Sequence, residues 1–410
     1  MKRKNILVGL DVGTTKICTL VARFSPNNKF EIIGIGNFPS YGLKKGCVVN
    51  IEKTVDSIRK SIMEAKIMAG VDFDNATVGI SGHHIASFNS QGEADVRGDE
   101  INHSDIERVM ADAKNIPLPA GREILHVIPQ DFKIDDIDGV KDPLGICGSK
   151  IECKVHIVTG QVQLIQNLVK CVEAAGVFAE QITLQPIASS EATLSVEEKE
   201  SGVVLVDIGG GTTDVAIWKD GSLAHSEIIP VGGNLFTNDL SLLLKIPFLE
   251  AEKLKIAYGN LLKEGITSKQ KIMIKWPLGE KPVELKVINE ILLSRTEELF
   301  KLINRVVDES GNYSKLASGY VLTGGGSLIP GLNTLGSIYL DGPTRIGYPM
   351  ILNGMTKSMQ NPKYSTVLGL LIEANKRRER TSEKSMILGS KSNFINKLKD
   401  SLRLALKEIF

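Results

Sequence analysis

The hydrophobic pattern of the chain contains one arrangement twice: an apolar run, an acid, a turn of Gly and Thr, and a second apolar run. The first copy spans Leu7–Lys16 and the second spans Val203–Asp214. β-branched apolar runs of this length are typical of buried strands. A third apolar run follows each copy, so both halves are predicted to open with three strands. These are Ile6–Leu10, Lys16–Phe24 and Phe30–Asn37, and then Gly202–Asp207, Asp214–Lys219 and Ser222–Pro230.

Apolar residues at helical spacing predict amphipathic helices after these strands. The predicted helices are Ile51–Ala69, Val162–Ala175, Gly233–Leu244, Phe248–Tyr258, Ile288–Asp308 and 364–376. Further strands are expected at Ala76–Ser81 and Tyr320–Thr323, and in a hairpin of Lys271–Trp276 with Pro282–Val287. Strands that alternate with helices predict a mixed α/β fold.

The stretch from about residue 84 to 158 interrupts this rhythm. It holds a predicted helix, Ser104–Lys114, in which Ser104 and Glu107 have the spacing of a capping box. Two predicted strands, Arg122–Ile137 and Ile151–Thr159, are separated by a segment rich in Asp, Gly and Pro. We therefore expect a small α/β subdomain inserted at this point.

The composition is that of an ordinary soluble globular protein of two or more domains. The chain has 410 residues, of which 42% are apolar and 24% charged, and its net charge is +1. Without a global basic field, nucleic acid is not an expected partner. No apolar run has the length of a membrane span. Five cysteines without a Cys-x-x-Cys pair indicate reduced thiols rather than disulfides or zinc.

The two Gly/Thr turns have the composition of phosphate-binding loops. Glycines let the backbone approach a phosphate closely, and successive N–H groups can converge on the anion. Asp11 and Asp207, at the strand ends, are candidates to hold the water ligands of Mg²⁺. An ordinary Asp-Gly hairpin turn would explain one copy, but two copies favour a cleft that grips a nucleoside triphosphate from both sides. The candidate hydroxyl donors are Thr14, Thr15, Thr212 and Thr213.

A third glycine-rich turn, Gly324–Gly326, follows the predicted strand Tyr320–Thr323. It could form a flat floor for adenine and ribose. Neither a dinucleotide-binding fingerprint nor a P-loop fits the chain, because the glycines after the first strand have the wrong spacing for both.

The order of these motifs resembles the actin/Hsp70/sugar-kinase superfamily, and the resemblance spans nearly the whole chain. In that superfamily's terms, Asp11–Lys16 looks like the first phosphate loop and Val206–Asp214 like the second. Gln185–Ala192 looks like the first connecting helix, Leu322–Gly326 like the adenosine loop, and Tyr364–Leu370 like the second connecting helix.

Within the superfamily, the chain is most similar to the FtsA family of bacterial cell-division proteins. The segments that carry this likeness are Leu125–Gln130, Val206–Thr212, Val321–Gly325, Arg345–Gly347 and Tyr364–Thr366. Members of that family lack one subdomain of actin and carry a different one, which matches the interruption at 84–158. The resemblance implies an actin-like two-lobed fold of duplicated RNase H-like units, with an inserted α/β subdomain and a C-terminal amphipathic helix.

The resemblance also implies subdomain boundaries. Subdomain 1A would comprise 1–83 and 159–198, the latter with the first connecting helix, and the insert, 1C, would comprise 84–158. Subdomain 2A would comprise 199–230 and 291–362, and 2B would comprise 231–290. The second connecting helix would follow at 363–376, then a flexible linker at 377–391 and a membrane-targeting helix at 392–410.

ATP and Mg²⁺ are the cofactors that the resemblance implies. Gln185 is the candidate catalytic residue, because hydrolases of the superfamily place Glu or Gln there to orient the attacking water. A plain helix-capping role for Gln185 is the alternative, so hydrolysis stays open. The nucleotide-binding residues implied are Asp11, Gly13, Thr14, Thr15, Lys16, Asp207, Gly209, Gly210, Gly211, Thr212, Thr213, Gly233, Asn234, Glu252, Lys255, Gly259, Gly324, Gly325 and Gly326.

The last nineteen residues form a predicted amphipathic helix that Ser392 could cap. A basic amphipathic helix suits the surface of an anionic membrane, and FtsA proteins end in such a helix. Docking onto its own domain and coiled-coil pairing are the alternatives. The membrane-facing candidates are Phe394, Ile395, Leu398, Leu402, Leu406, Ile409 and Phe410, with Lys397, Lys399, Arg403 and Lys407 on the basic face.

The expected function is that of a structural adaptor. The resemblance implies a protein that binds ATP, polymerises, and tethers FtsZ to the cytoplasmic side of the inner membrane at the division septum. The FtsZ C-terminal tail peptide would dock around residues 233–290, and later division proteins would bind the insert, 84–158. The alternatives are an ATP-dependent small-molecule kinase, which has no use for the tail, and a pilus-assembly relative, which would lack it.

Overall fold

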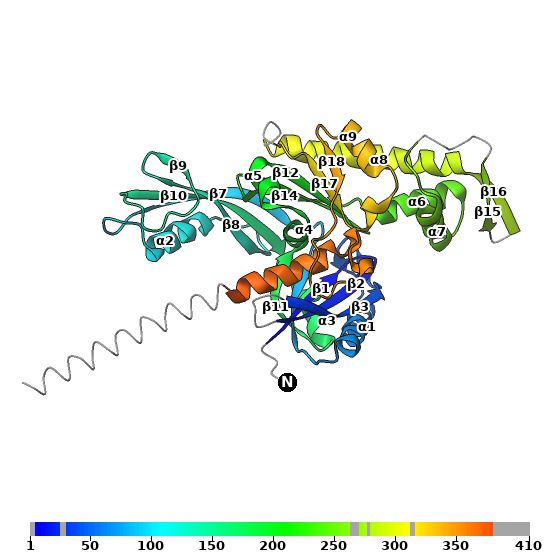
Figure 1. Ribbon diagram of the computed structural model, residues 1–410, viewed down its shortest axis with the longest axis horizontal. Helices are drawn as coiled ribbons and strands as arrows, with labels where there is room; N and C mark the ends of the chain where they lie inside the picture. The colour runs from blue at the N-terminus through cyan, green and yellow to red at the C-terminus, as the bar shows by residue number, and fades with distance from the viewer. Residues whose placement is uncertain (1–4, 25–29, 263–269, 277–278, 312–315, 380–410) are drawn as a thin grey trace, which may run out of the picture.

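Two five-stranded mixed sheets form the centres of two lobes in the computed structural model, which describes residues 5–24, 30–262, 270–276, 279–311 and 316–379 (Figure 1). The strand order is β11-β6-β1-β2-β3 in lobe 1 and β14-β13-β12-β17-β18 in lobe 2. In both sheets the first three strands are antiparallel neighbours and the remaining pairs are parallel. The duplicated two-lobed fold predicted from the sequence is therefore confirmed.

Lobe 1 is built on strands whose middle residues are fully buried. Its elements are β1 (Ile6–Val12), β2 (Lys16–Phe24), β3 (Phe30–Pro39), β4 (Leu43–Lys44), β5 (Cys47–Val48), α1 (Ile51–Ala69), β6 (Asn75–Ile80), α3 (Val162–Ala174), β11 (Phe178–Leu184) and α4 (Gln185–Thr193). Helix α1 begins where the Asn50 side chain accepts from the Lys53 amide and ends at Gly70 in the left-handed conformation. Its apolar face packs on the sheet with α3.

Lobe 2 repeats the plan with a larger helical layer. Its elements are α5 (Val196–Ser201), β12 (Val203–Ile208), β13 (Thr213–Lys219), β14 (Ser222–Ile229), α6 (Gly233–Leu244), α7 (Phe248–Tyr258), β15 (Lys271–Trp276), β16 (Gly279–Glu284), α8 (Leu285–Glu309), β17 (Tyr320–Thr323), α9 (Leu332–Tyr339) and β18 (Thr344–Ile346). Helices α6 and α7 lie with the β15–β16 hairpin at the far end of the lobe (Figure 1).

The insert is a four-stranded sheet, ordered β7-β10-β8-β9, with one helix. Its elements are β7 (Ala86–Asp95), α2 (His103–Lys114), β8 (Arg122–Ile134), β9 (Ile137–Val140) and β10 (Lys150–Gln161). In Figure 1 it projects away from the two lobes on the side opposite α7. The inserted α/β subdomain that the sequence predicts is present, and its elements run from Ala86 to Gln161.

Three local expectations were wrong. The capping box of α2 uses Asn102 and Asp105 rather than Ser104 and Glu107, because the Asn102 amide oxygen reaches the first free N–H groups and the buried Asp105 returns the bond. The strand expected to run to residue 137 is broken at Asp135, which has a φ of +49°. The second hairpin strand begins at Gly279 rather than at residue 282, and Leu285 already belongs to α8.

Two helices connect the lobes, and they cross closely. One is α4; the other comprises residues 365–379, so it continues past the end expected at 376. The remaining linker and the predicted tail helix lie outside the described residues. No helix in the described part of the chain is both long and apolar enough to cross a membrane.

Gly369 lies where the second connecting helix meets α4, and a methyl group there would overlap the carbonyl oxygen of Ala188. Gly369→Ala is expected to lower the free energy of unfolding by about 3 kcal/mol, since two helix backbones must separate to admit it. Urea denaturation measures the change. The matched control is Gly342→Ala, whose added methyl would meet its nearest atoms at an ordinary 3.4 Å. Equal effects of the two substitutions would contradict the tight crossing.

Candidate nucleotide-binding site

A cleft of about 250 Å³ lies between the lobes, with the two Gly/Thr turns on opposite walls. The turns are equivalent in geometry: Gly13 N donates to Lys16 O over 3.1 Å, and Gly209 N donates to Thr212 O over 2.9 Å. The cleft is lined by Asp11, Val12, Gly13, Thr14, Thr15, Lys16, Gly46, Ser81, Gln185, Asp207, Gly209, Gly210, Gly211, Thr212, Asp214, Gly324, Gly325, Lys363 and Thr366.

The two turns touch across the cleft. A methyl group at Gly211 would lie 2.5 Å from Thr14 Oγ1, and one at Gly210 would overlap the side chain of Thr15. Only glycine permits this approach, which brings main-chain N–H groups from both lobes to one place. The arrangement suits an anion held from two sides.

Three buried carboxylates surround the turns, and neutral donors hold each of them. Gln185 Nε2 donates to Asp11 Oδ1 over 2.9 Å, and Ser81 Oγ donates to Asp214 Oδ1 over 2.7 Å. Asp207 Oδ2 accepts from Ser189 Oγ at 2.5 Å and Thr366 Oγ1 at 3.0 Å. Ser189 lies on α4 and Thr366 on the second connecting helix, so each of the two helices that connect the lobes donates a hydrogen bond to this carboxylate.

The carboxylates repel one another. Burial raises the pKa of Asp11 to about 6, and Lys16 only partly offsets this. Burial, with the charge of Asp207 added, raises the pKa of Asp214 to about 8. Burial also raises the pKa of Asp207. A nearby divalent cation would relieve this repulsion.

The oxygen-rich donor set fits Mg²⁺ held through water. Among the described residues, no three His, Cys, Asp or Glu side chains are arranged to hold an ion directly. Asp11 and Asp207 are the residues that would hold its water ligands. The ion would neutralise phosphate charge between the loops.

Most of the predicted site residues come together in this cleft, but Thr213 faces elsewhere. Its hydroxyl, expected to donate to phosphate, donates instead to Val231 O over 2.7 Å in the core of lobe 2. Gly326 follows the cleft-lining Gly324 and Gly325 without lining the cavity itself.

A second group of predicted residues lies beside the second turn rather than in the cavity. Gly233 N donates to Gly209 O over 2.9 Å, and Asn234 N donates to Gly210 O over 2.8 Å. The first residues of α6 are therefore hydrogen-bonded to the second Gly/Thr turn. Lys255 Nζ bonds Gly233 O over 2.9 Å and pairs with Glu252 over 2.7 Å, and burial lowers its pKa. Gly259 ends α7. Contact of these five residues with the nucleotide stays a prediction.

Several cleft residues were missed by sequence reasoning. Asp214 carried a signal, since it directly follows the Thr-Thr pair, and Thr366 lies in a segment that carries the family likeness. Ser81 reaches the cleft from the end of β6 without any local signal, and Ser189 of α4 contacts it only through Asp207. Gly46 enters through the β4–β5 turn, where its N–H donates to Thr14 Oγ1 over 3.0 Å. Sequence spacing alone does not reveal such contacts.

Two models of known protein families match parts of this chain. Residues 82–159 match the SHS2 domain inserted in FtsA, and residues 204–369 match cell division protein FtsA. The chain is 42% identical to the cell division protein FtsA of Pseudomonas aeruginosa, over 90% of this chain and 88% of that protein. It is 40% identical to the FtsA of Borreliella burgdorferi, over 98% of both.

Among solved structures, the chain is similar to the PilM–PilN type IV pilus biogenesis complex. The TM-score is 0.66 at 16% identity, covering 90% of this chain and 98% of that one. At this level of identity, the similarity supports the actin-like fold and no statement about function.

Asp214→Asn is expected to stabilise the protein at alkaline pH and to have a smaller effect near pH 5. A carboxyl whose folded pKa is raised binds its proton more tightly when folded, so its contribution is complete below the unfolded pKa, 3.8, and is lost as pH rises through about 8. Thermal unfolding at about pH 5 and about pH 9 measures the difference.

The matched control is Asp105→Asn in α2. The backbone N–H of Asn102 lowers the pKa of Asp105, so its contribution to stability is present above the unfolded pKa and is lost as pH falls. This substitution should therefore destabilise the protein at neutral pH. A melting temperature of Asp214→Asn below that of the wild type at pH 9 would refute a strained Asp214.

Proposed function

The chain belongs to the FtsA family of cell division proteins, and from this premise we propose that it is an ATP-binding, actin-like adaptor. It polymerises, binds FtsZ, and holds FtsZ filaments to the cytoplasmic face of the inner membrane at the division septum. The observation that carries the proposal is the cleft in which two equivalent Gly/Thr turns meet beside three buried carboxylates.

In this proposal, the turns bind the phosphates of ATP through main-chain N–H groups and the hydroxyls of Thr14, Thr15 and Thr212. Asp11 and Asp207 hold Mg²⁺ through water. The amide nitrogen of Gln185 donates a hydrogen bond to Asp11, so its amide oxygen is available to orient a water at the γ-phosphate. ATP thereby joins the two lobes in the conformation that polymerises.

A groove in lobe 2 supports docking of the FtsZ tail peptide. It has a volume of about 400 Å³ and lies between α6 and α8. Leu243, which is 67% exposed, and Val287 supply apolar surface, while Asp239 and Glu298 pair with Arg295. A groove that combines apolar side chains with an acidic excess suits a peptide of apolar and basic residues. The groove begins within the expected 233–290 segment and extends along α8 to Glu298.

The alternative functions have less support. The chain is 42% and 40% identical to the two FtsA proteins named above over most of their length, whereas its likeness to the pilus complex is at 16% identity. A small-molecule kinase would share the cleft but has no use for the basic amphipathic segment 392–410. Membrane binding rests on the sequence pattern of that segment, and binding of later division proteins rests on the presence of the insert.

Asp207→Asn is expected to weaken Mg²⁺-dependent ATP binding at least about tenfold, as loss of a partner of metal-bound water usually does, and to weaken assembly. Calorimetry measures the first effect and sedimentation of polymers the second. Asp138→Asn, in an exposed part of β9, is the control that should change neither. Normal filaments formed by the Asp207 variant without nucleotide would contradict the role of the cleft in assembly.

A reconstitution with anionic vesicles separates the membrane and FtsZ functions. Deletion of residues 392–410 should release the protein from vesicles, while Leu243→Glu should keep it there but weaken FtsZ tail peptide binding about tenfold or more, because a charge enters the groove. Leu242→Glu is the matched control, since Leu242 is equally exposed but does not line the groove.

Cosedimentation with vesicles, with and without FtsZ, measures both effects. A wild-type protein that stays soluble would favour the kinase alternative. Retained vesicle binding after deletion of the tail would refute its role as the anchor, and equal effects of the two leucine variants would refute the groove.

A further inference from the structure

Helix α4 carries two of the donors that hold the cleft carboxylates, yet it is poorly stabilised by itself. It has nine residues, and Leu184, which precedes it, supplies no side-chain cap. Gln185 at its start reaches Asp11, and Ser189, one turn later, reaches Asp207. A helix this short depends on contacts from outside to keep its position.

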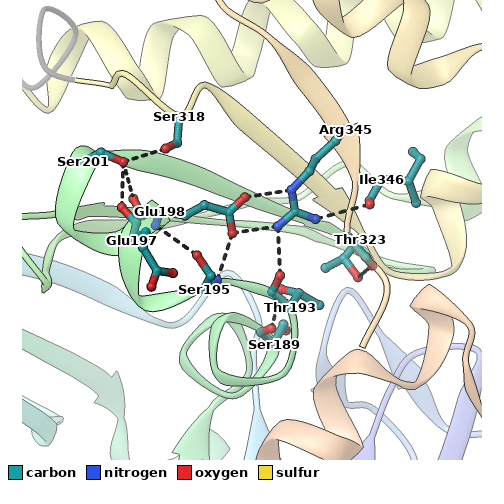
Figure 2. Close-up of polar contacts among 11 residues, drawn as sticks. Ser189, Thr193, Ser195, Glu197, Glu198, Ser201, Ser318, Thr323, Arg345 and Ile346 are labelled. Atoms are coloured by element: carbon teal, nitrogen blue, oxygen red, sulfur yellow. Dashed lines mark hydrogen bonds and ion pairs between the residues drawn. The ribbon is translucent and has the colours of Figure 1, made fainter. Parts of the chain in front are cut away.

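The carboxyl end of α4 is held by Arg345 of β18 (Figure 2). Arg345 Nη2 donates to the main-chain oxygen of Thr193 over 3.0 Å. The same guanidinium forms a two-point pair with Glu198, with Nε on one carboxylate oxygen and Nη2 on the other, both over 2.8 Å. A cation at this end also interacts favourably with the helix dipole.

Glu198 is itself fixed in place. It is the third residue of α5, and its Oε2 accepts from the backbone N–H of Ser195 over 2.9 Å as part of a capping box. Figure 2 shows the Glu198 carboxylate directed at the guanidinium of Arg345. Because Arg345 needs its planar fork to bond a carboxylate and a carbonyl together, lysine cannot replace it fully.

The amino end of α4 is held from the insert. His126 Nε2 accepts from the backbone N–H of Leu184 over 3.0 Å, just before Gln185. Burial lowers the pKa of His126 to about 4, so the ring is neutral at pH 7 and can accept this bond. Both ends of α4 therefore depend on residues from other parts of the fold.

We propose that Arg345 is a positioning residue for the nucleotide cleft. Together with Glu198, it fixes the carboxyl end of α4, and so fixes Ser189 Oγ against Asp207 and Gln185 Nε2 against Asp11. This inference rests on the proposed function, because its consequence is the arrangement of two carboxylates around Mg²⁺ in an ATP site. The Arg345–Glu198 pair is partly exposed, with 44% and 21% of the two side chains accessible, so its charge attraction alone contributes little to stability.

The test is ATP affinity of the full-length protein with Mg²⁺ and with EDTA. Arg345→Met should weaken binding about fivefold in Mg²⁺, less than direct loss of a metal-water partner, and less than about twofold in EDTA. The reason is that α4 holds the carboxylates and not the phosphate loops. Arg345→Lys, which can bond Thr193 or Glu198 but not both as arginine does, should give an intermediate value.

The matched control is Arg108→Met in the insert. Arg108 also bonds one carboxylate, that of Asp105, and one main-chain oxygen, that of Asp95, each over 2.5 Å, but it is remote from α4. A purely structural effect of losing an arginine would lower the melting temperature of both variants without changing the Mg²⁺ dependence of ATP affinity.

Four outcomes would decide the matter. Equal Mg²⁺-dependent affinity in the wild type and in Arg345→Met, or an equal loss in Arg108→Met, would overturn this inference alone. If Arg345→Met fails to fold, Glu198→Gln makes the same test, with a smaller weakening of the same kind expected and an unchanged affinity overturning the inference. A wild-type protein that binds no ATP under either condition would overturn the proposed function as well.

Discussion

The repulsion among three buried carboxylates is the constraint on which the centre of this molecule depends. Asp11, Asp207 and Asp214 are each at least 92% buried, close enough that the charge of one raises the pKa of another. Ionised acids in such a place need hydrogen bonds or a cation. Destabilised groups that persist at a cleft are typical of functional sites, where stability is exchanged for binding.

This constraint explains why polar residues occupy the crossings between the lobes. Ser189 and Thr366 are hydroxyl residues within connecting helices, and both direct their oxygen atoms at Asp207. Gly369, on the same helix as Thr366, allows that helix to approach α4. The two crossings are therefore joined to each other by packing and to the cleft by hydrogen bonds. A rotation of one lobe against the other has to change these hydrogen bonds. The shape of the cleft therefore depends on the relative orientation of the two lobes.

The sequence was most informative where local signals mark the ends of an element. Helices α6 and α7 have the predicted bounds, because Gly232, Pro247 and Gly259 mark their ends. Strand β7 was missed because it is largely exposed and shows no alternation of apolar residues. The cap of α2 was misplaced by two residues because Asn102 and Asp105 offer the same spacing as Ser104 and Glu107, and only burial of Asp105 decides between them.

In the site, the residues of the repeated turns could be predicted from their order, whereas their partners could not. Ser81 and Asp214 are 133 positions apart in the sequence, and Arg345 and Thr193 are 152 apart. No period or spacing links such pairs; they follow from the fold. Thr213 illustrates the converse, since its neighbour Thr212 lines the cleft while strand alternation turns Thr213 into the core.

The insert shows how polar contacts can also govern an interface between subdomains. Strand β14 is the edge of the lobe 2 sheet, and side chains of the insert bond its free main-chain oxygens: Ser87 to Ser226 over 2.5 Å, and Gln130 to Leu223 over 2.9 Å. Covering an exposed edge in this way prevents it from pairing with another chain. Because His126 of the same insert also holds the start of α4, the insert contacts lobe 2 at its sheet edge and lobe 1 at its connecting helix. The insert is therefore fixed by polar contacts with both lobes.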